Sequence, residues 1–157
     1  MDMRVETIRF GTLEVDESSV VRMPRGPLGF EDQKEFCLIQ HRPDMPFRWL
    51  QSTSDPALAF VVIDPAEYFV GYEIEISDLD AELLQLTCAE DSLVLVIVTV
   101  GKEGKTVTAN LAAPVVVNSK TLAGMQIVLQ DDRYSTQHLL LKQEEKVSME
   151  NATAKAA

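Results

Sequence analysis

The sequence has few of the residue types from which catalytic and metal sites are built. It contains two histidines, His41 and His138, and two cysteines, Cys37 and Cys88. A Ser or Cys hydrolase needs a nucleophile beside a histidine base, and neither histidine lies in a recognisable nucleophile motif. Cys37 and His41 form a lone pair without the further ligands that zinc requires. We therefore expect no catalytic residues, no bound metal and no cofactor.

Long hydrophobic runs are also absent. Apolar runs such as Leu93 to Val98 are far shorter than the ~20 residues of a membrane-spanning helix, and Met1 to Phe10 contains no apolar signal core. The sequence predicts a cytoplasmic protein that does not insert into a membrane. In that reducing compartment, Cys37 and Cys88 are expected to be two buried thiols rather than a disulfide.

The chain is poor in basic residues, with 14 Lys and Arg against 25 Asp and Glu and a formal net charge of −11. Phosphate recognition depends on clustered Lys and Arg, so direct binding to nucleic acid is not expected. Most of the charge comes from one segment, residues 64–91, which contains no Lys, Arg or His. Its nine acidic residues are Asp64, Glu67, Glu73, Glu75, Asp78, Asp80, Glu82, Glu90 and Asp91.

This acidic segment has two interpretations. It forms either a solvated face that keeps the protein soluble or a surface that binds a basic partner. Nine like charges without a counter-ion repel one another, and a basic surface would relieve that repulsion. The pattern therefore favours the binding surface.

Short segments typical of β-strands, in contrast, are abundant. Short runs rich in β-branched and aromatic residues alternate with Gly, Pro, Asp and Ser, which indicates about ten strands of a sandwich or barrel. Residues 101–104 are typical of a hairpin turn. In a further extended stretch, Glu73 and Glu75 share one face while Ile74 and Ile76 pack inward. The expected strands are 4–10, 36–40, 47–52, 58–64, 93–100, 106–112, 115–118 and 122–130.

One helix is predicted. Ser77 to Asp80 forms a capping box, in which the Ser oxygen accepts an early helix N–H and Asp80 reaches back. Leu79, Leu83 and Leu86 then share one face, and Asp78 and Glu82 lie toward solvent.

The predicted fold is mostly β, a single barrel-like domain with one short helix. It covers residues 1–141, a length that suits one core, and residues 142–157 are expected to be frayed or disordered. Two prolines and two glycines make residues 23–29 a shaped loop that ends at Phe30 and Glu31.

An enzyme remains an alternative. Carboxylate pairs can act as acid and base, as in glycosidases, and aromatic side chains could line a sugar pocket. The same aromatic residues are also typical of core packing, and Trp49 in particular is predicted to be structural. They are Phe47, Trp49, Phe60, Tyr68 and Phe69.

Several motifs in this order resemble the FliW family of flagellar assembly factors. The resemblance runs from about Arg9 to Leu140. The segments that carry it are Arg9 to Gly11, Met23 to Glu31, Phe47 to Ser52, Asp55 with Pro56, Leu58 to Phe60 and Thr108 to Asn118.

The resemblance implies a small cytoplasmic β-barrel protein that is not an enzyme. Family members bind flagellin and, once flagellin has been exported, bind CsrA, a small basic regulator that represses flagellin translation. A general secretion chaperone that holds an amphipathic helix is a partly compatible alternative. We expect a monomer. Its predicted partner-binding residues are Glu73, Glu75, Asp78, Asp80 and Glu82 on the acidic segment, with Phe30 and Glu31 on the loop.

Overall fold

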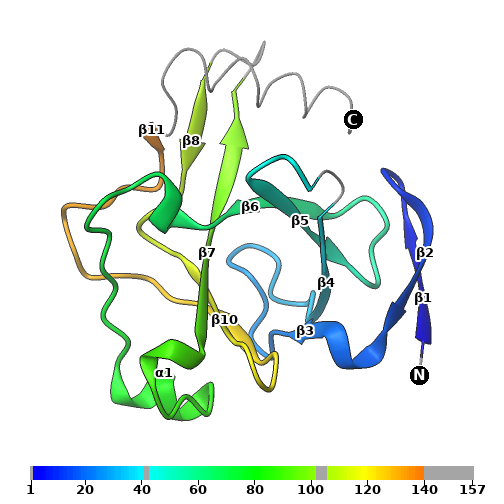
Figure 1. The fold of residues 1–157 in the computed structure, drawn as a ribbon, viewed down its shortest axis with the longest axis horizontal. Coiled ribbons are helices and arrows are strands. Elements are labelled where there is room, and N and C mark those ends of the chain that lie inside the picture. The colour runs from blue at the N-terminus through cyan, green and yellow to red at the C-terminus, as the bar shows by residue number, and fades with distance from the viewer. Residues whose placement is uncertain (1, 41–42, 102–105, 140–157) are drawn as a thin grey trace.

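A computed structural model describes residues 2–40, 43–101 and 106–139 (Figure 1). The tip of the predicted 101–104 hairpin and the predicted tail 142–157 lie outside these ranges. The described strands are β1 (Asp2–Thr7), β2 (Gly11–Asp16), β3 (Val20–Arg22), β4 (Glu35–Ile39), β5 (Phe47–Ser52), β6 (Ala59–Ile63), β7 (Ser92–Val100), β8 (Val107–Ala109), β9 (Val115–Asn118), β10 (Gly124–Gln126) and β11 (His138–Leu139). The helices are α1 (Asp78–Leu83) and the 3-10 turns η1 (Glu17–Ser19), η2 (Pro65–Glu67) and η3 (Ala89–Asp91).

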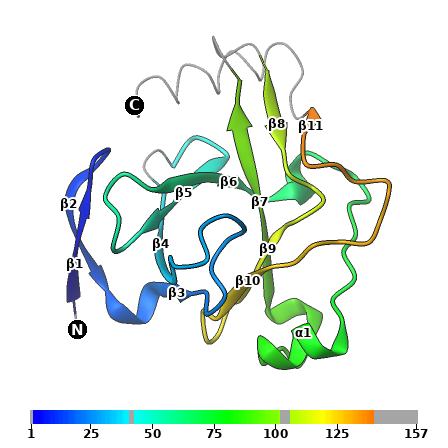
Figure 2. The same cartoon turned by 180° about the vertical axis from the view of Figure 1, so that it is seen from behind.

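Most strands belong to one antiparallel sheet in the order β10-β9-β7-β6-β5-β4-β3. The long strand β7 is its centre, because its first half pairs with β9 and its second half pairs with β6 and β8. The sheet curls until its two edges meet (Figures 1 and 2): Arg22 of β3 forms a parallel bridge with Ala123, and its N–H donates to Leu122 O at 2.9 Å. The mostly β, barrel-like prediction is confirmed, although one bridge does not close a fully hydrogen-bonded barrel.

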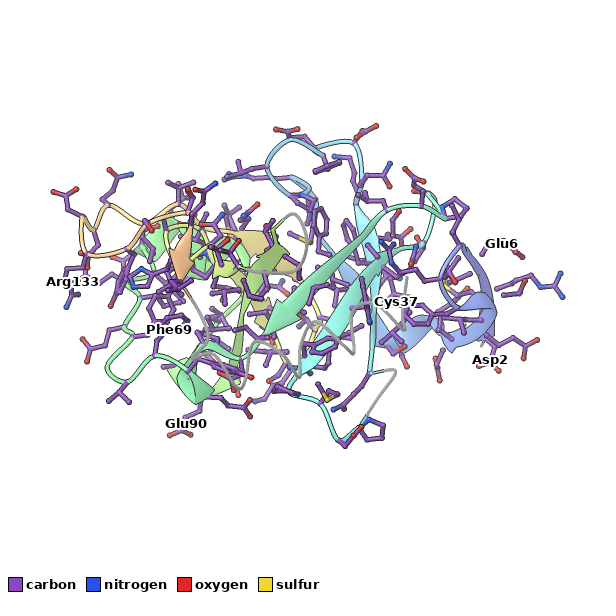
Figure 3. All side chains as sticks on the ribbon, turned by 90° about the horizontal axis from the view of Figure 1, so that it is seen from above. Asp2, Glu6, Cys37, Phe69, Glu90 and Arg133 are labelled. Carbon is purple, nitrogen blue, oxygen red and sulfur yellow. The ribbon has the colours of Figure 1, made fainter. Side chains whose placement is uncertain are left out.

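The hairpin β1–β2 forms a separate two-stranded sheet at one end of the molecule. Figure 3 shows Asp2 and Glu6 of this hairpin at the end opposite Arg133. The hairpin is held by its turn, where Phe10 packs edge-on against Trp49 and Ile8 N–H donates to Pro56 O at 2.9 Å.

Three clusters of buried side chains form the core. The first contains Phe47 and Trp49, each 4% exposed, with Tyr68 and Phe69 packed against it. Phe60 is partly buried against the second. The predicted aromatic group is therefore distributed through the core, and the packing interpretation of Phe47 and Trp49 is confirmed. The third cluster contains Leu84, Val116, Met125 and Ile127, and Ile74 and Ile76 pack against it.

One prediction about a single residue is wrong, and the apolar face of α1 is only partly buried. Cys37 is buried as predicted, but Cys88 is exposed because it precedes the surface turn η3. Leu79 and Leu83 are 63% and 48% exposed, and the residue that α1 buries is Leu84, which follows the helix. The helix has only six residues and meets the core at its C-terminal end alone.

The strand predicted around Glu73 to Ile76 is extended but belongs to no described sheet. Its alternation is nevertheless as predicted, because both glutamates are exposed and both isoleucines are half-buried. Other strands are shorter than predicted: β1 ends at Thr7 and β10 spans only Gly124–Gln126. The sequence patterns did not identify β2, β3 or β11.

Candidate functional site

The helix of the acidic segment begins at the predicted Ser77 cap, but among the described residues the Asp80 carboxylate does not accept the Ser77 N–H that would complete the predicted capping box. Ser77 has extended backbone angles, φ −63° and ψ 157°, and its hydroxyl accepts the Asp80 N–H at 3.0 Å. Asp78 and Asp80 lie in the first turn, where the partial positive charge of the helix N-terminus favours carboxylates. The cap therefore fixes the position of the first acidic side chains of the helix, Asp78 and Asp80.

The C-terminal end of α1 closes by a Schellman motif. Leu86 N–H donates to Ala81 O at 2.9 Å and Gln85 N–H donates to Glu82 O at 3.0 Å, while Gln85 takes the left-handed conformation with φ 57°. This turn directs Leu84 into the third core cluster. The helix is thus anchored by the residues that follow it.

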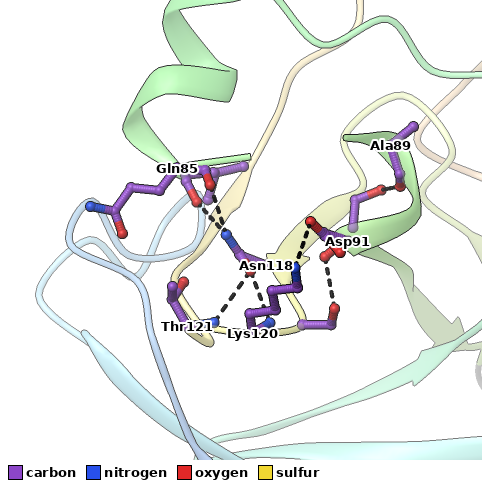
Figure 4. A network of polar contacts seen from close by, with 9 residues as sticks. Gln85, Ala89, Asp91, Asn118, Lys120 and Thr121 are labelled. Carbon is purple, nitrogen blue, oxygen red and sulfur yellow. Dashed lines mark hydrogen bonds and ion pairs between the residues drawn. The ribbon is translucent and has the colours of Figure 1, made fainter. Parts of the chain in front are cut away.

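Asn118 ties that end of the helix to the sheet (Figure 4). Its side chain, on a residue 2% exposed, donates from Nδ2 to Leu84 O at 2.8 Å and to Gln85 O at 3.2 Å. Its Oδ1 accepts the N–H groups of Lys120 and Thr121 at 2.9 and 3.2 Å. One buried amide therefore satisfies two carbonyls just after α1 and two N–H groups of the turn between β9 and β10.

The structure brings three of the five predicted acidic residues to one groove. Glu73, Glu75 and Asp80 line a surface groove of about 460 Å³, whose other wall is residues 127–131 together with the basic residue Arg133. Asp78 and Glu82 are exposed on α1 nearby but do not line this groove. Exposed apolar side chains accompany these charges: Leu79, Leu83 and Val128, the last 53% exposed. The acidic surface therefore also offers apolar contact area.

The segment before α1 is held by tyrosines. Tyr72 and Tyr134 pack edge-on with ring centroids 4.7 Å apart, and Tyr72 O–H donates to Leu111 O at 2.7 Å. The Glu73 N–H donates to the Tyr134 hydroxyl at 3.2 Å. These contacts fix where the extended segment 73–77 starts.

The loop 23–31 is shaped by glycines at two of its turns. Gly26 has φ +65°, and a Cβ there would lie 2.7 Å from backbone atoms of Phe30 and Glu31. Gly29 has φ +86°, and its N–H donates to the Glu31 carboxylate at 3.1 Å. The loop is anchored to β10, since Leu28 N–H donates to Gln126 Oε1 at 2.8 Å.

The two predicted loop contacts are at the surface. Phe30 is 40% exposed, with its ring edge-on to Phe60 at 5.3 Å, and Glu31 is exposed. Neither lines the acidic groove. The base of the loop does approach α1, because Pro24 and Arg25 share a hollow of about 80 Å³ with Leu83 and Leu84. The structure therefore places the loop and the acidic segment on either side of that hollow.

Sequence reasoning missed the polar residues that position this surface, namely Asn118, Gln126 and Tyr134. The sequence pattern places Asn118 only at the end of an apolar strand. The available signal was its position, a polar residue directly after three valines and before the polar Ser119. That position indicates a strand end, but it does not identify the distant carbonyls of α1 as partners.

Asp131, one of the carboxylates of the groove, is not suited to act as a general acid. A general acid needs a raised pKa, whereas Asp131 has its pKa lowered by hydrogen bonds from Arg133, at 2.7 Å for the shortest contact. The aromatic residues proposed for a sugar pocket lie elsewhere, with Phe47 and Trp49 in the core. The geometry gives no support to the glycosidase alternative.

Within residues 2–40, 43–101 and 106–139, no three His, Cys, Asp or Glu side chains come together in a way that could hold a metal ion. No helix in the same ranges has the length and apolar character needed to cross a bilayer.

Comparison with known proteins gives one consistent result. Residues 4–140 match the model of the FliW protein family. A flagellar assembly factor FliW from Syntrophus aciditrophicus is 40% identical over 143 residues, covering 91% of this chain and 90% of the relative. One from Geobacillus kaustophilus is 41% identical over 138 residues, covering 88% of this chain and 95% of the relative. A crystal structure of the flagellar assembly factor FliW superposes with a TM-score of 0.83 at 39% identity, covering 90% of this chain and 99% of the solved one.

Proposed function

The chain belongs to the FliW family of flagellar assembly factors, and from this premise we propose that it binds flagellin in the cytoplasm and, when free of flagellin, binds CsrA. Binding to CsrA relieves the repression of flagellin synthesis. In this proposal the protein is a partner-switching regulator and not an enzyme.

The observation that carries the proposal is the exposed acidic surface. Residues 64–91 contain nine carboxylates and no basic side chain, and Glu73, Glu75, Asp78 and Glu82 are exposed. A basic RNA-binding partner such as CsrA complements this surface. Complementary charges raise the association rate and select the partner.

Apolar side chains on the same surface support a second kind of contact. Leu79 and Leu83 stand one turn apart on α1 and remain exposed, and Val128 is exposed beside the groove. Exposed leucines at this spacing suit the apolar face of an amphipathic helix. We assign this contact to flagellin.

Switching then needs only competition. Flagellin held by the protein lowers the concentration that is free to bind CsrA, and mass action returns the protein to CsrA when flagellin leaves the cell. The two partners need not use identical residues, provided that their contacts overlap.

Calorimetric titration tests the proposal with purified flagellin and purified CsrA. Each should bind the full chain alone, and saturating flagellin should weaken the apparent CsrA affinity by at least tenfold. The proposal fails if neither protein binds. Unchanged CsrA affinity in the presence of saturating flagellin would refute the switching step.

A further inference from the structure

Strand β7 has an open edge along its first half. Its residues Ser92–Leu95 pair with β9 on one side only, whereas β6 pairs with Val96–Val98 through Val61–Ile63. Continuing that register would place Pro65 opposite Val94. Proline has no N–H to donate, and the chain turns away there as η2. Among the described residues, β7 therefore has no strand partner on this edge below Val96.

The backbone groups of Val94 point toward this open edge. Asn110 N–H donates to Ile97 O at 2.9 Å on the opposite side of β7. Successive residues of a strand direct their backbone groups alternately to its two sides, so the odd-numbered Ile97 and the even-numbered Val94 face opposite ways. Val94 thus presents an N–H and a C=O where β6 has departed.

Tyr72 and Ile74, at the start of the extended segment before α1, form the facing wall. Ile74, Glu75 and Ile76 alternate in burial like a strand, yet no backbone hydrogen bond of theirs occurs within the described part of the chain. The Glu73 N–H is directed to Tyr134, away from β7. By the same alternation, Ile74 directs its backbone groups to the side opposite Tyr134, and Ile74 lines the same groove as Val94.

A groove of about 270 Å³ lies between these two walls. Tyr72 and Ile74 line one side, Ser92, Leu93 and Val94 line the other, and Asp64, Pro65 and Ala66 complete the lining. Figures 1 and 2 show the segment that precedes α1 running beside the lower half of β7. Two unpaired backbone edges therefore face one groove.

We propose that this groove binds an extended peptide of a partner protein, which adds a strand to the sheet along β7. Main-chain hydrogen bonds to Val94 and Ile74 supply the affinity, as in other cases of strand addition. The inference rests on the proposed function only in that the protein works by binding other proteins.

The charge around the groove specifies the peptide. Both walls belong to residues 64–94, which contain no Lys, Arg or His, and the charged residue that lines the groove is Asp64. The lining side chains of Ile74, Leu93 and Val94 are apolar and half-buried. The peptide therefore alternates basic with β-branched apolar residues. A second copy of this acidic chain is disfavoured by like-charge repulsion.

Three synthetic hexapeptides test the proposal against the full chain by calorimetry. The first alternates Lys and Val, the second has the same sequence with every valine N-methylated, and the third alternates Glu and Val. We expect the first to bind at least tenfold more tightly than either of the others, and to slow hydrogen exchange of the Ile74 and Val94 amides. The N-methylated peptide keeps the charge and side chains, so equal binding by it would overturn strand addition.

Two alanine-to-tryptophan variants provide a matched test. Asp64-Pro65-Ala66 and Asp55-Pro56-Ala57 form the same turn, with Asp Oδ1 accepting the alanine N–H at 2.9 and 3.0 Å. Both alanines are exposed, but only Ala66 lines the groove. Ala66→Trp should weaken binding of the Lys-Val peptide at least tenfold, and Ala57→Trp should leave it unchanged.

The outcomes separate this inference from the proposed function. The proposal that the groove binds a peptide is refuted if the Lys-Val peptide does not bind at millimolar concentration, or if the two tryptophan variants have equal effects. Binding of CsrA and flagellin could still be measured in either case. If Ala66→Trp does not fold, as judged by circular dichroism, the comparison with the N-methylated peptide decides. If the Lys-Val peptide binds but neither CsrA nor flagellin does, the proposal of a peptide-binding groove stands and the proposed partners are refuted.

Discussion

Trp49 joins the β1–β2 hairpin to the main sheet. Its ring lies edge-on to Phe10 and Phe47, at 5.9 and 6.5 Å, and the Arg9 guanidinium lies 4.9 Å above it. We predict that Trp49→Ala lowers the free energy of unfolding by ~3–5 kcal/mol, because truncating a buried Trp leaves a cavity. Urea unfolding measures the loss, and Val70→Ala at a fully exposed site serves as the control.

An unchanged unfolding free energy for Trp49→Ala, together with lost CsrA or flagellin binding, would make Trp49 an interface residue. A typical domain has only ~5–15 kcal/mol of stability, so the expected loss is readily measured.

At the same scale, the sequence reveals some side-chain environments and hides others. The burial of Ile74 and Ile76 and the exposure of Glu73 and Glu75 follow from strict alternation. The Ser77 cap follows from local chemistry. Asn118 could not be recognised because its partners are backbone carbonyls 33 and 34 residues away, and a sequence pattern carries no signal for a main-chain acceptor.

The end of helix α1 stores local strain in Gln85. This residue takes φ 57°, a left-handed conformation that glycine adopts without a Cβ clash. We predict that Gln85→Gly raises the unfolding free energy by up to ~1 kcal/mol, or a melting temperature ~2–4 °C higher. Ala81→Gly, inside the helix, should lower it by ~0.5–1 kcal/mol. Equal losses for both changes would show that backbone entropy outweighs the conformational strain.

The loop that presents Phe30 depends on the absence of a side chain at Gly26. A Cβ there would press on the backbone of Phe30 and Glu31, whereas a Cβ at Gly29 would meet nothing within 4 Å. Both glycines have positive φ, so both alanine variants carry the conformational cost of ~1–2 kcal/mol. We predict that Gly26→Ala loses at least ~1 kcal/mol more than Gly29→Ala in urea unfolding. Equal losses would mean that the Gly26 contact relaxes freely.

At the scale of elements, strongly patterned segments were predictable and short ones were not. Strand β7 follows from its apolar run, and β5 was predicted with its observed bounds. Strands β3 and β11 have three and two residues, too few for a period to appear. The extended segment 73–76 carries a strand pattern without strand pairing, because alternation reports which side chains are buried and not which backbone edges are satisfied.

Across the whole molecule, the asymmetric charge should control partner choice more than stability. Glu75 and Glu82 are exposed, so we predict that Glu75→Lys with Glu82→Lys keeps the fold and weakens CsrA binding at least tenfold, or ~1.4 kcal/mol. Binding of CsrA should also weaken as salt rises, because added salt shortens the Debye length, which is ~10 Å at 0.1 M ionic strength. Flagellin binding should be less sensitive to salt if apolar helix packing dominates it.

The matched control reverses Glu14 and Glu17, which are exposed on the hairpin strand β2 and the adjoining turn η1. Calorimetry of both double variants measures the difference. Equal losses would mean that net charge alone matters, and no loss at Glu75 and Glu82 would make the acidic segment a solvated face.

The bridge between Arg22 and Ala123 also determines how much of the chain must be synthesised before the sheet can be completed. A ribosome releases the chain from its N-terminus, so β3 has emerged long before the residue that completes the curl of the sheet. The carboxylates of α1 emerge early as well, but their anchor Asn118 comes late. A nascent chain therefore displays the acidic sequence before it has the acidic surface. A chain ending at Val117 should bind neither CsrA nor flagellin in a pull-down, which would confine partner capture to molecules whose synthesis is nearly complete.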